Sequence, residues 1–445
     1  IDTREKRKKD FHLAKYTHSL FQGWFITQTL GFWSILRLFL QVFKPSSTPA
    51  AASSFKQMDK FSKLSIENFN EKYRENNLQI GFTVTEMTDR VEALLKSIGL
   101  VDHFAPLIYV VGHGSSSVNN THYSAYDCGA CSGRPGSVNA RVLSFMANHN
   151  QVRAMLNERG LHLPESTQFV GGLHDTTRDE IAFFDEDQLS EKNQNLHKKN
   201  LNTFHQALDL NAKERSRRLA SIDTGLSPKK IHQQILTRSV SLFEPRPELN
   251  HATNAMCIVG SRELSKDLFL DRRSFLNSYN YKIDPNGDIL VNIMKPLGPV
   301  CGGINLEYYF SRVDNHKLGA GSKLPHNVMG LIGVANGVDG DLRPGLPSQM
   351  IEVHDPLRLM IVVEHFPEIV LKTVQSVDSM YEWFKNEWVH LVAIHPENHN
   401  IYYFKDGRFS IYEPITASIP STAKIASIIE STDDNISVQI LEHKA

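Results

Sequence analysis

Residues 106–136 decide the fold, and their sequence is PLIYVVGHGSSSVNNTHYSAYDCGACSGRPG. The stretch begins with an apolar run at 107–111 that is rich in β-branched residues, as a buried strand would be. The pattern then breaks at Gly112 into a polar loop. This loop holds two histidines and two cysteines, His113, His122, Cys128 and Cys131.

The end of such a strand is where an α/β protein usually binds its ligands. In an open α/β sheet, ligands bind in the crevice beyond the carboxyl ends of the strands. His113 comes directly after the glycine that ends the apolar run. The sequence therefore predicts that His113 lies at a functional edge of a sheet.

A helix is expected before this strand. Thr83 and Glu86 form a capping-box pair at its start, and Gly99 ends it. One face of the helix is apolar and consists of Val91, Leu94, Leu95 and Ile98.

Helices and strands alternate after the loop. One or two helices are expected over 138–157, with Gly160 as a C-terminal cap. A second strand is expected over 168–174, followed by Asp175, and a short third strand over 181–184. This alternation predicts an α/β fold with a mixed or parallel sheet.

The later part of the chain has a different pattern. Residues 186–240 are polar and are most simply a solvated helical segment, and residues 299–305 are loop-like. Strands are expected near the C-terminus over 359–363, 389–394, 401–404 and 408–412. Short turns join the last three of these strands, so we expect a β-meander in a C-terminal α+β region.

The composition is that of an ordinary globular protein. The 445 residues are 41% hydrophobic and 22% charged, with 48 Lys and Arg against 49 Asp and Glu. The net charge of −1 gives no general attraction to nucleic acid, so no nucleic-acid partner is expected. Four cysteines are too few for a disulfide scaffold in a chain of this length, which favours a reduced, cytoplasmic compartment.

The N-terminal 44 residues form a separate pattern. A basic segment is followed by residues 19–36, which carry no charge, and then by Arg37. The polar residues near its centre argue against a membrane span and favour a buried or interfacial helix. The aromatic residues of this helix are Phe21, Trp24, Phe25, Phe32 and Trp33. No secretory signal is visible, and the initial Ile1 suggests an internal or C-terminal piece of a longer protein.

His113 and Cys128 are candidate zinc ligands. Imidazole and thiolate both bind this borderline-soft ion, and a folded loop can bring together two ligands that are separated by 14 residues. Three other interpretations stay open from the residues alone. The side chains pack or form hydrogen bonds in a glycine-rich loop, Cys128 and Cys131 form a redox dithiol, or residues 112–117 bind phosphate.

Several long motifs resemble those of one family. They are GHGSSSVNNTHYSAYDCGACSGRPGSVNAR at 112–141, LFLDRRSFLNSY at 268–279, PVCGGINLEYYFSRVDN at 299–315, KLPHNVMGLIGVANG at 323–337 and DLRPGLPSQMIEVHDPLRL at 341–359. On these motifs the chain resembles the DabA family, the zinc-binding subunit of an energy-coupled inorganic carbon transporter. The resemblance covers nearly the whole chain.

The resemblance implies a metal site similar to that of β-carbonic anhydrases. In the family, two ligands come from a Cys-x-Asp-x-Arg segment, and a later His and Cys correspond to His113 and Cys128. Cys257 and Cys301 are not followed by the aspartate of that segment. Asp2 and Arg4 match the x-Asp-x-Arg part of it, with the cysteine position falling just before Ile1. We therefore expect the C-terminal part of a DabA, with half of the zinc site.

Neighbouring polar residues are expected around this half-site. His122 and Asp127 are candidates to form hydrogen bonds to the metal ligands, or they are surface residues. His174 and Asp175 follow the second strand, where a loop hydrogen bond is the simpler interpretation.

The resemblance also implies a function and a partner. The family hydrates CO2 to bicarbonate at the cytoplasmic face of the cell membrane, as a peripheral subunit. Its partner is DabB, a membrane protein similar to the antiporter-like subunits of respiratory complex I. Two alternatives are a free-standing carbonic-anhydrase-like hydratase and a non-catalytic assembly subunit, the latter because half of the metal site is missing.

Four regions are expected along the chain. Residues 1–44 form a basic and apolar helical segment, and residues 45–79 form a linker and a polar helix. Residues 80–240 form a carbonic-anhydrase-like α/β region with the His and Cys half-site. Residues 241–445 form the C-terminal α+β domain. These boundaries follow the changes in composition and pattern.

Overall fold

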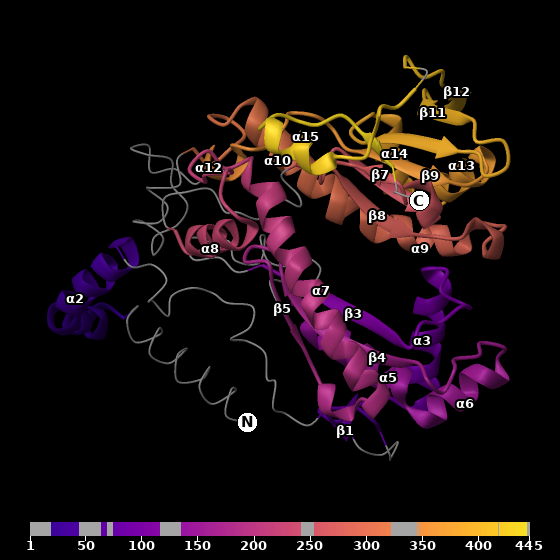
Figure 1. Cartoon of the computed structure of the whole chain (residues 1–445), viewed down its shortest axis with the longest axis horizontal. Helices are drawn as coiled ribbons and strands as arrows, with labels where there is room; N and C mark the ends of the chain where they lie inside the picture. Colours follow the sequence, from indigo (N-terminus) through magenta and orange to yellow (C-terminus); the bar gives the residue numbers. More distant parts are fainter. Residues whose placement is uncertain are drawn as a thin grey trace.

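The computed structural model describes residues 19–43, 64–68, 74–115, 135–241, 253–321, 345–346, 348–416 and 418–442. Within these ranges the protein is a mixed α/β structure, which confirms the expected fold class (Figure 1). It contains a three-stranded sheet near the candidate site and a six-stranded sheet in the C-terminal half. The four expected domain boundaries stay a prediction.

The three-stranded sheet carries His113. Strands β3 (Leu107–Gly114) and β4 (Gln168–Asp175) are parallel, and β5 (Glu180–Phe183) is antiparallel to β4. One face packs against α3 (Val84–Ser97), α5 (Ser137–Asn148) and α6 (Asn150–Glu158). The other face packs against α7 (Glu191–Ser216). The expected mixed sheet is confirmed. Strands β4 and β5 lie within one residue of their predicted bounds, whereas β3 extends three residues past its predicted end.

The periodicity of β3 explains this three-layer arrangement. Successive side chains of a strand point to opposite faces. Ile108 and Val110 pack into the cluster formed with α3, α5 and α6, whereas Tyr109 packs against Phe204 of α7. The strand is therefore apolar on both faces because helices cover both.

The predicted end of the first strand is wrong. The apolar run ends at Val111, but β3 continues to Gly114 because its last residues pair with Leu173, His174 and Asp175 of β4. His113 is thus a strand residue, not a loop residue. Its side-chain direction is consequently fixed by the pleat of the sheet.

The helices beside the sheet start and end where the sequence predicts. In α3, Glu86 N–H donates to Thr83 Oγ1 at 3.2 Å, and Thr83 N–H donates to Glu86 Oε2 at 2.8 Å. These two bonds form the expected capping box. Gly160 has a φ of +84° just beyond α6, as a helix-ending glycine does.

Two glycines allow α5 to approach the sheet closely. A Cβ atom at Gly112 would lie 2.4 Å from the Gly136 carbonyl carbon, directly before α5. A Cβ atom at Gly171 of β4 would lie 2.8 Å from Arg141 Cα. Larger residues at either position would push α5 away from the ends of β3 and β4.

The interpretation of residues 186–240 as a solvated segment is wrong in part. Helices α7 and α8 (Pro228–Arg238) form there, but they contribute a buried cluster of their own. The members of this cluster are Ala212, Leu219, Ile222, Ile231 and Ile235. In Figure 1, α7 is the long magenta helix that runs from the lower sheet toward the upper one. It connects the two halves of the protein.

The six-stranded sheet has the order β12-β11-β10-β9-β6-β8. Strands β6 (Met256–Gly260), β8 (Ser274–Ser278), β9 (Met360–Glu364) and β10 (His390–Ile394) run parallel. Strands β11 (Ile401–Lys405) and β12 (Arg408–Ile411) follow as antiparallel neighbours. The expected β-meander is confirmed, because β10, β11 and β12 are joined in chain order.

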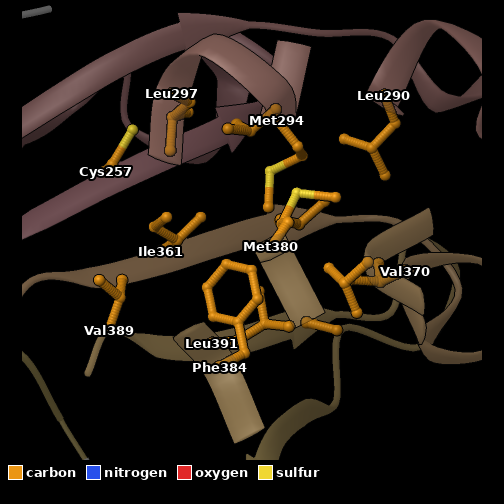
Figure 2. Packing of buried hydrophobic residues seen from close by; sticks show 14 of the residues in the cluster. Cys257, Leu290, Met294, Leu297, Ile361, Val370, Met380, Phe384, Val389 and Leu391 are labelled. Atoms are coloured by element: carbon orange, nitrogen blue, oxygen red, sulfur yellow. The ribbon is translucent and has the colours of Figure 1, made fainter. Parts of the chain in front are cut away.

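The largest core cluster surrounds this sheet. It combines inward-facing strand residues with α9 (Asp288–Leu297), α13 (Pro367–Gln375) and α14 (Asp378–Lys385). Figure 2 shows the side chains of this cluster in one shared interior, among them Cys257, Met294, Ile361 and Phe384.

The loop predicted over residues 299–305 is wrong. Residues Gly298–Gly303 form a π-helix, η6, that joins α9 to α10 (Ile304–Val313). Gly302 lies against Val389 and Trp383, so its small size serves packing and does not interrupt the helix. Among the described residues, Asp288–Val313 is one helical stretch long and apolar enough to cross a membrane. Leu290, Met294 and Tyr308 of this stretch are buried in the protein.

The N-terminal helix α2 (Leu20–Phe43) exposes its apolar side chains. The interpretation of this segment as a core helix is therefore wrong, whereas the interfacial one stays open. Its large exposed residues are Leu20, Phe21, Trp24, Phe25, Phe32, Trp33, Ile35, Leu36, Phe39 and Phe43. In Figure 1, α2 lies at the left edge of the protein, away from both sheets.

Short elements complete the described structure. Strands β1 (Arg74–Glu75) and β2 (Leu78–Gln79) form a hairpin, so the predicted polar helix does not extend over 74–79. Asn76 and Asn77 have positive φ, which gives the two-residue turn its twist. Near the C-terminus, β7 (Leu268–Phe269), β13 (Ser421–Thr422) and β14 (Gln439–Leu441) form a small sheet. The last two short helices are α12 (Ser348–Ile351) and α15 (Ile425–Ser431).

Candidate functional site

His113 lies beside a second histidine at the carboxyl end of the parallel pair. His113 of β3 is the register partner of His174 of β4. Partners in adjacent strands lie about 4.8 Å apart and point to the same face of the sheet. Both side chains are half-buried. The strand register thus brings together two imidazoles that are 61 positions apart in the chain.

Cys128, His122 and Asp127 lie outside the described residues, as does Cys131. The structure therefore places one of the two predicted zinc ligands. Within the described ranges, no group of three or more His, Cys, Asp or Glu side chains is arranged to hold a metal ion. The assignment of His113 and Cys128 as ligands stays a prediction.

His174 is held by a buried carboxylate. Its Nε2 atom lies 3.3 Å from Asp179 Oδ1, in the turn between β4 and β5. The same oxygen accepts a hydrogen bond of 2.8 Å from Asn211 Nδ2 of α7. A histidine in such contact with a carboxylate has a fixed ring orientation. The expected loop hydrogen bond at His174 is thus found, with a partner in the turn.

The carboxylate in turn pairs with a buried arginine. Arg215 Nε of α7 lies 2.8 Å from Asp179 Oδ2, and neither side chain is exposed to solvent. Arg215 also donates from Nη2 to the Thr177 carbonyl at 2.8 Å. The pair consequently fastens the β4–β5 turn to the end of α7.

The ion pair keeps Asp179 charged. Burial on its own raises the pKa of the Asp179 carboxyl, but the nearby charges of Arg215, His174 and Arg272 outweigh it. The net effect is a pKa below the ordinary value for aspartate. Asp179 is therefore an anion near neutral pH, directly behind His174.

Hydrogen bonds also join the ends of β3 and β4. Ser115 Oγ and Thr177 Oγ1 lie 2.6 Å apart in a buried contact, and Thr176 N–H donates to the Gly114 carbonyl at 2.8 Å. Asp175 Oδ1 accepts from Thr177 N–H at 3.1 Å. Asp175, the last residue of β4, thus shapes the turn that supports the edge.

The start of α5 lies at the same edge. Gly136 N–H, just before the helix, donates to the His113 carbonyl at 2.7 Å. The first turn of α5 contains no acidic residue and has no side-chain cap. Free N–H groups at a helix start favour negative charge nearby. The first turn of α5 thus adds no negative charge to the His113 edge.

A second set of contacts links this site to the segment between β7 and β8. Arg217, at the end of α7, forms a buried ion pair with Asp271, just after β7. Arg272, the next residue, donates to Asn211, which itself bonds Asp179. The end of α7 thus connects the histidine edge with the C-terminal half.

Cys257 and Cys301 are not near this edge. Both are free thiols buried in the core of the six-stranded sheet, with exposures of 0% and 7%. Cys257 Sγ accepts a hydrogen bond from Asn277 Nδ2 at 3.4 Å. Their burial in this core, away from His113, is consistent with the lack of a Cys-x-Asp-x-Arg segment at either cysteine.

Several residues at the site have no recognisable signal in the sequence. The run of residues 175–180 after the second strand was visibly polar, but nothing in it singled out Asp179. Arg215 and Asn211 lay in the segment interpreted as solvated helix. Their role follows from the packing of α7 on the sheet, which local sequence patterns do not show.

The fold and this edge define a mixed α/β protein with a histidine pair at the carboxyl ends of two parallel strands. Comparison with known families extends this description. The family described as "Probable inorganic carbon transporter subunit DabA" matches residues 2–389. The chain belongs to the DabA family, as its motifs indicated.

Curated relatives support this membership. The chain is 59% identical to the probable inorganic carbon transporter subunit DabA of Azotobacter vinelandii, over 99% of this chain and 52% of that protein. It is 57% identical to the one of Nitrosospira multiformis, over 99% of this chain and 49% of that protein. The chain thus spans about half the length of these relatives. No solved structure gives a significant match, so a fold like that of β-carbonic anhydrases stays a prediction.

The first prediction concerns the buried ion pair. Replacing Asp179→Asn leaves the Arg215 charge buried without its partner, which costs about 3–5 kcal/mol of the free energy of unfolding at pH 7. Because the folded-state pKa lies below that of the unfolded chain, the unfolded state binds the proton first as the pH falls. The stabilisation is therefore present above about pH 4 and is lost below it.

Urea unfolding at several pH values between about 7 and 3 tests this expectation. Asp187→Asn is the matched control, because Asp187 is exposed. The account fails if Asp179→Asn unfolds with the same free energy as the control at pH 7. It also fails if the difference from wild type does not shrink in acid.

Proposed function

We propose that this chain is part of an energy-coupled inorganic carbon uptake complex, in which His113 and Cys128 hold zinc for the hydration of CO2 to bicarbonate. The curated relatives are named as probable inorganic carbon transporter subunits, which supports a role in inorganic carbon uptake. The observation that carries the chemistry is the placement of His113 at the carboxyl end of β3, beside His174.

The residues of the edge suit this chemistry. Bound zinc would supply the Lewis acidity that lets a water molecule lose its proton near neutral pH. His113 provides an imidazole whose direction is fixed by the strand. His174, held by Asp179, places a second oriented imidazole beside it. The start of α5 favours the negative charge of bicarbonate.

The proposed partner is the membrane protein DabB, and α2 is the proposed docking element. Soluble proteins rarely leave a large apolar patch exposed, and such a patch commonly marks an interaction site. Trp24 is 66% exposed and Phe21 is 82% exposed. With this partner, the chain is a peripheral protein on the cytoplasmic face of the membrane.

The zinc proposal predicts a specific loss in the intact DabA protein, purified with its membrane partner. His113→Ala removes a ligand, so zinc falls well below one ion per complex and CO2 hydration falls at least about 100-fold. His205→Ala is the matched control, because His205 is exposed on α7. Metal analysis and stopped-flow CO2 hydration are the measurements.

Three outcomes would contradict this proposal, each in a different part. Unchanged zinc content and growth on inorganic carbon after His113→Ala would favour a non-catalytic assembly subunit. One tightly held zinc on the 445-residue chain alone would also contradict it, because this chain lacks a recognisable Cys-x-Asp-x-Arg segment. Hydration of CO2 without DabB would instead favour a free-standing hydratase.

The docking proposal predicts the effect of a polar face on α2. Replacing Phe21, Trp24 and Phe25 by Ser should abolish co-purification with DabB in mild detergent, while the unfolding midpoint of the chain stays within error. Leu78→Ser with Ile415→Ser is the matched control, since both residues are exposed apolar residues outside α2. Co-purification that survives the triple substitution would overturn the docking role of α2.

A further inference from the structure

The six-stranded sheet contains a switch in strand order. The chain passes from β6 to β8 on one side of β6 and then to β9 on its other side, and β10 continues outward from β9. In open parallel sheets, ligands bind beyond the carboxyl ends of the strands at the point where the order reverses. In this sheet that point lies between β6 and β9.

A pocket lies at this point. Its volume is about 480 Å³. Its walls are the last residues of β6, β8 and β9, the residues that follow β6 and β8, and Ile98, Gly99 and Pro396. This size lies within the range of small-molecule sites. The lining residues used below are Ser261, Arg262, Tyr281, Lys282 and Glu364.

Glu364 places a carboxylate in the wall of the pocket. It is the last residue of β9 and is 7% exposed. Its Oε2 atom accepts a hydrogen bond of 2.6 Å from Ser261 N–H, directly after β6. No donor among the described residues bonds its Oε1 atom. One carboxylate oxygen is therefore fixed, and the other is available to a ligand.

Gly260 makes this position possible. It is the last residue of β6, and a Cβ atom on it would lie 2.8 Å from Glu364 Cβ and 3.0 Å from Oε2. Any larger residue would displace the carboxylate from the end of the strand. The chain therefore combines a glycine on β6 with a glutamate on β9 at the switch in strand order.

Other polar groups near the pocket already have partners. His365 Nε2 lies 3.0 Å from the Asp284 carbonyl, and its Nδ1 accepts from Phe366 N–H at 2.8 Å. Tyr279, also fully buried, donates its hydroxyl to Asp284 at 2.7 Å. These bonds build a rigid wall in which Glu364 is the buried carboxylate, with one oxygen that no described donor bonds. Glu263, the other carboxylate of the wall, is exposed and pairs with Lys266.

Two basic residues border the pocket. Arg262 follows β6, Lys282 follows β8, and both are exposed. Neither forms an ion pair with another described residue, whereas the nearby Glu263 pairs with Lys266 at 3.3 Å. Lys282 Nζ lies 6.0 Å from the centre of the Tyr281 ring, so its charge lies near the aromatic wall. A phosphate or similar anion is a good partner for an exposed arginine and an exposed lysine that form no ion pair.

We propose that this pocket binds a small hydroxylated anion of the sugar-phosphate class. Hydroxyl groups of the ligand donate to Glu364, and its phosphate lies against Arg262 and Lys282, while Tyr281 offers an aromatic wall. The site is separate from the His113 edge, because it is built on the other sheet. Its existence does not depend on the zinc chemistry proposed above.

Isothermal titration of the 445-residue chain with ribose 5-phosphate tests this proposal. Ribose alone and inorganic phosphate alone separate the two halves of the ligand. Ribose 5-phosphate should bind at least about tenfold more tightly than either half. Glu364→Gln should weaken its binding at least about tenfold, and so should Lys282→Ala. Glu382→Gln and Lys385→Ala are matched controls on the exposed surface of α14 and should have no effect.

Three results would overturn the proposal. The first is no binding of ribose 5-phosphate up to about 10 mM. The second is binding no tighter than that of inorganic phosphate, which would mean attraction to surface charge. The third is unchanged binding in Glu364→Gln. Because Glu364 is buried and its variant has to fold, Arg262→Ala provides an exposed second variant that should also weaken binding at least about tenfold.

Discussion

The buried pair between Asp179 and Arg215 is the interaction on which the histidine edge depends. Both side chains are removed from water, so each charge is tolerable only because the other is present. The pair fastens the β4–β5 turn to α7. Asn211 forms hydrogen bonds with Asp179 and with Arg272, which lies beyond β7. The histidine edge of the three-stranded sheet is thereby tied to the segment between β7 and β8, which leads into the six-stranded sheet.

This constraint explains how the edge is organised for chemistry. The parallel register sets His113 beside His174, the pair behind His174 fixes its ring, and Gly112 lets the start of α5 lie against β3. Catalytic groups must be held in fixed positions, because a small displacement of a reacting group lowers the rate by a large factor. The same principle applies at the switch point of the second sheet, where Gly260 allows Glu364 to reach Ser261.

Local sequence patterns predicted much of this fold, but they did not predict contacts between residues that lie far apart in the sequence. The capping box of α3, the strand at Gln168–Asp175 and the β10–β12 meander each depend on neighbours in sequence, and all were predicted. The contact of Asp179 with Arg215 joins residues 36 positions apart and is set by how α7 lies on the sheet. Glycine and proline predicted a loop at 299–305, but residues 298–303 form a π-helix in which Gly302 packs against Trp383. Membership of the DabA family was visible in the long motifs, because these preserve residue identity and not only hydrophobic pattern.

The central claim is that the His113 imidazole at the end of β3 binds zinc. X-ray absorption at the zinc edge, recorded on the intact DabA protein purified with its membrane partner, measures the ligand atoms directly. The account predicts a mixed nitrogen and sulfur shell that loses one imidazole in His113→Gln and is unchanged in His174→Gln, whose ring is already held by Asp179. A zinc shell that is identical in wild type and His113→Gln would contradict it.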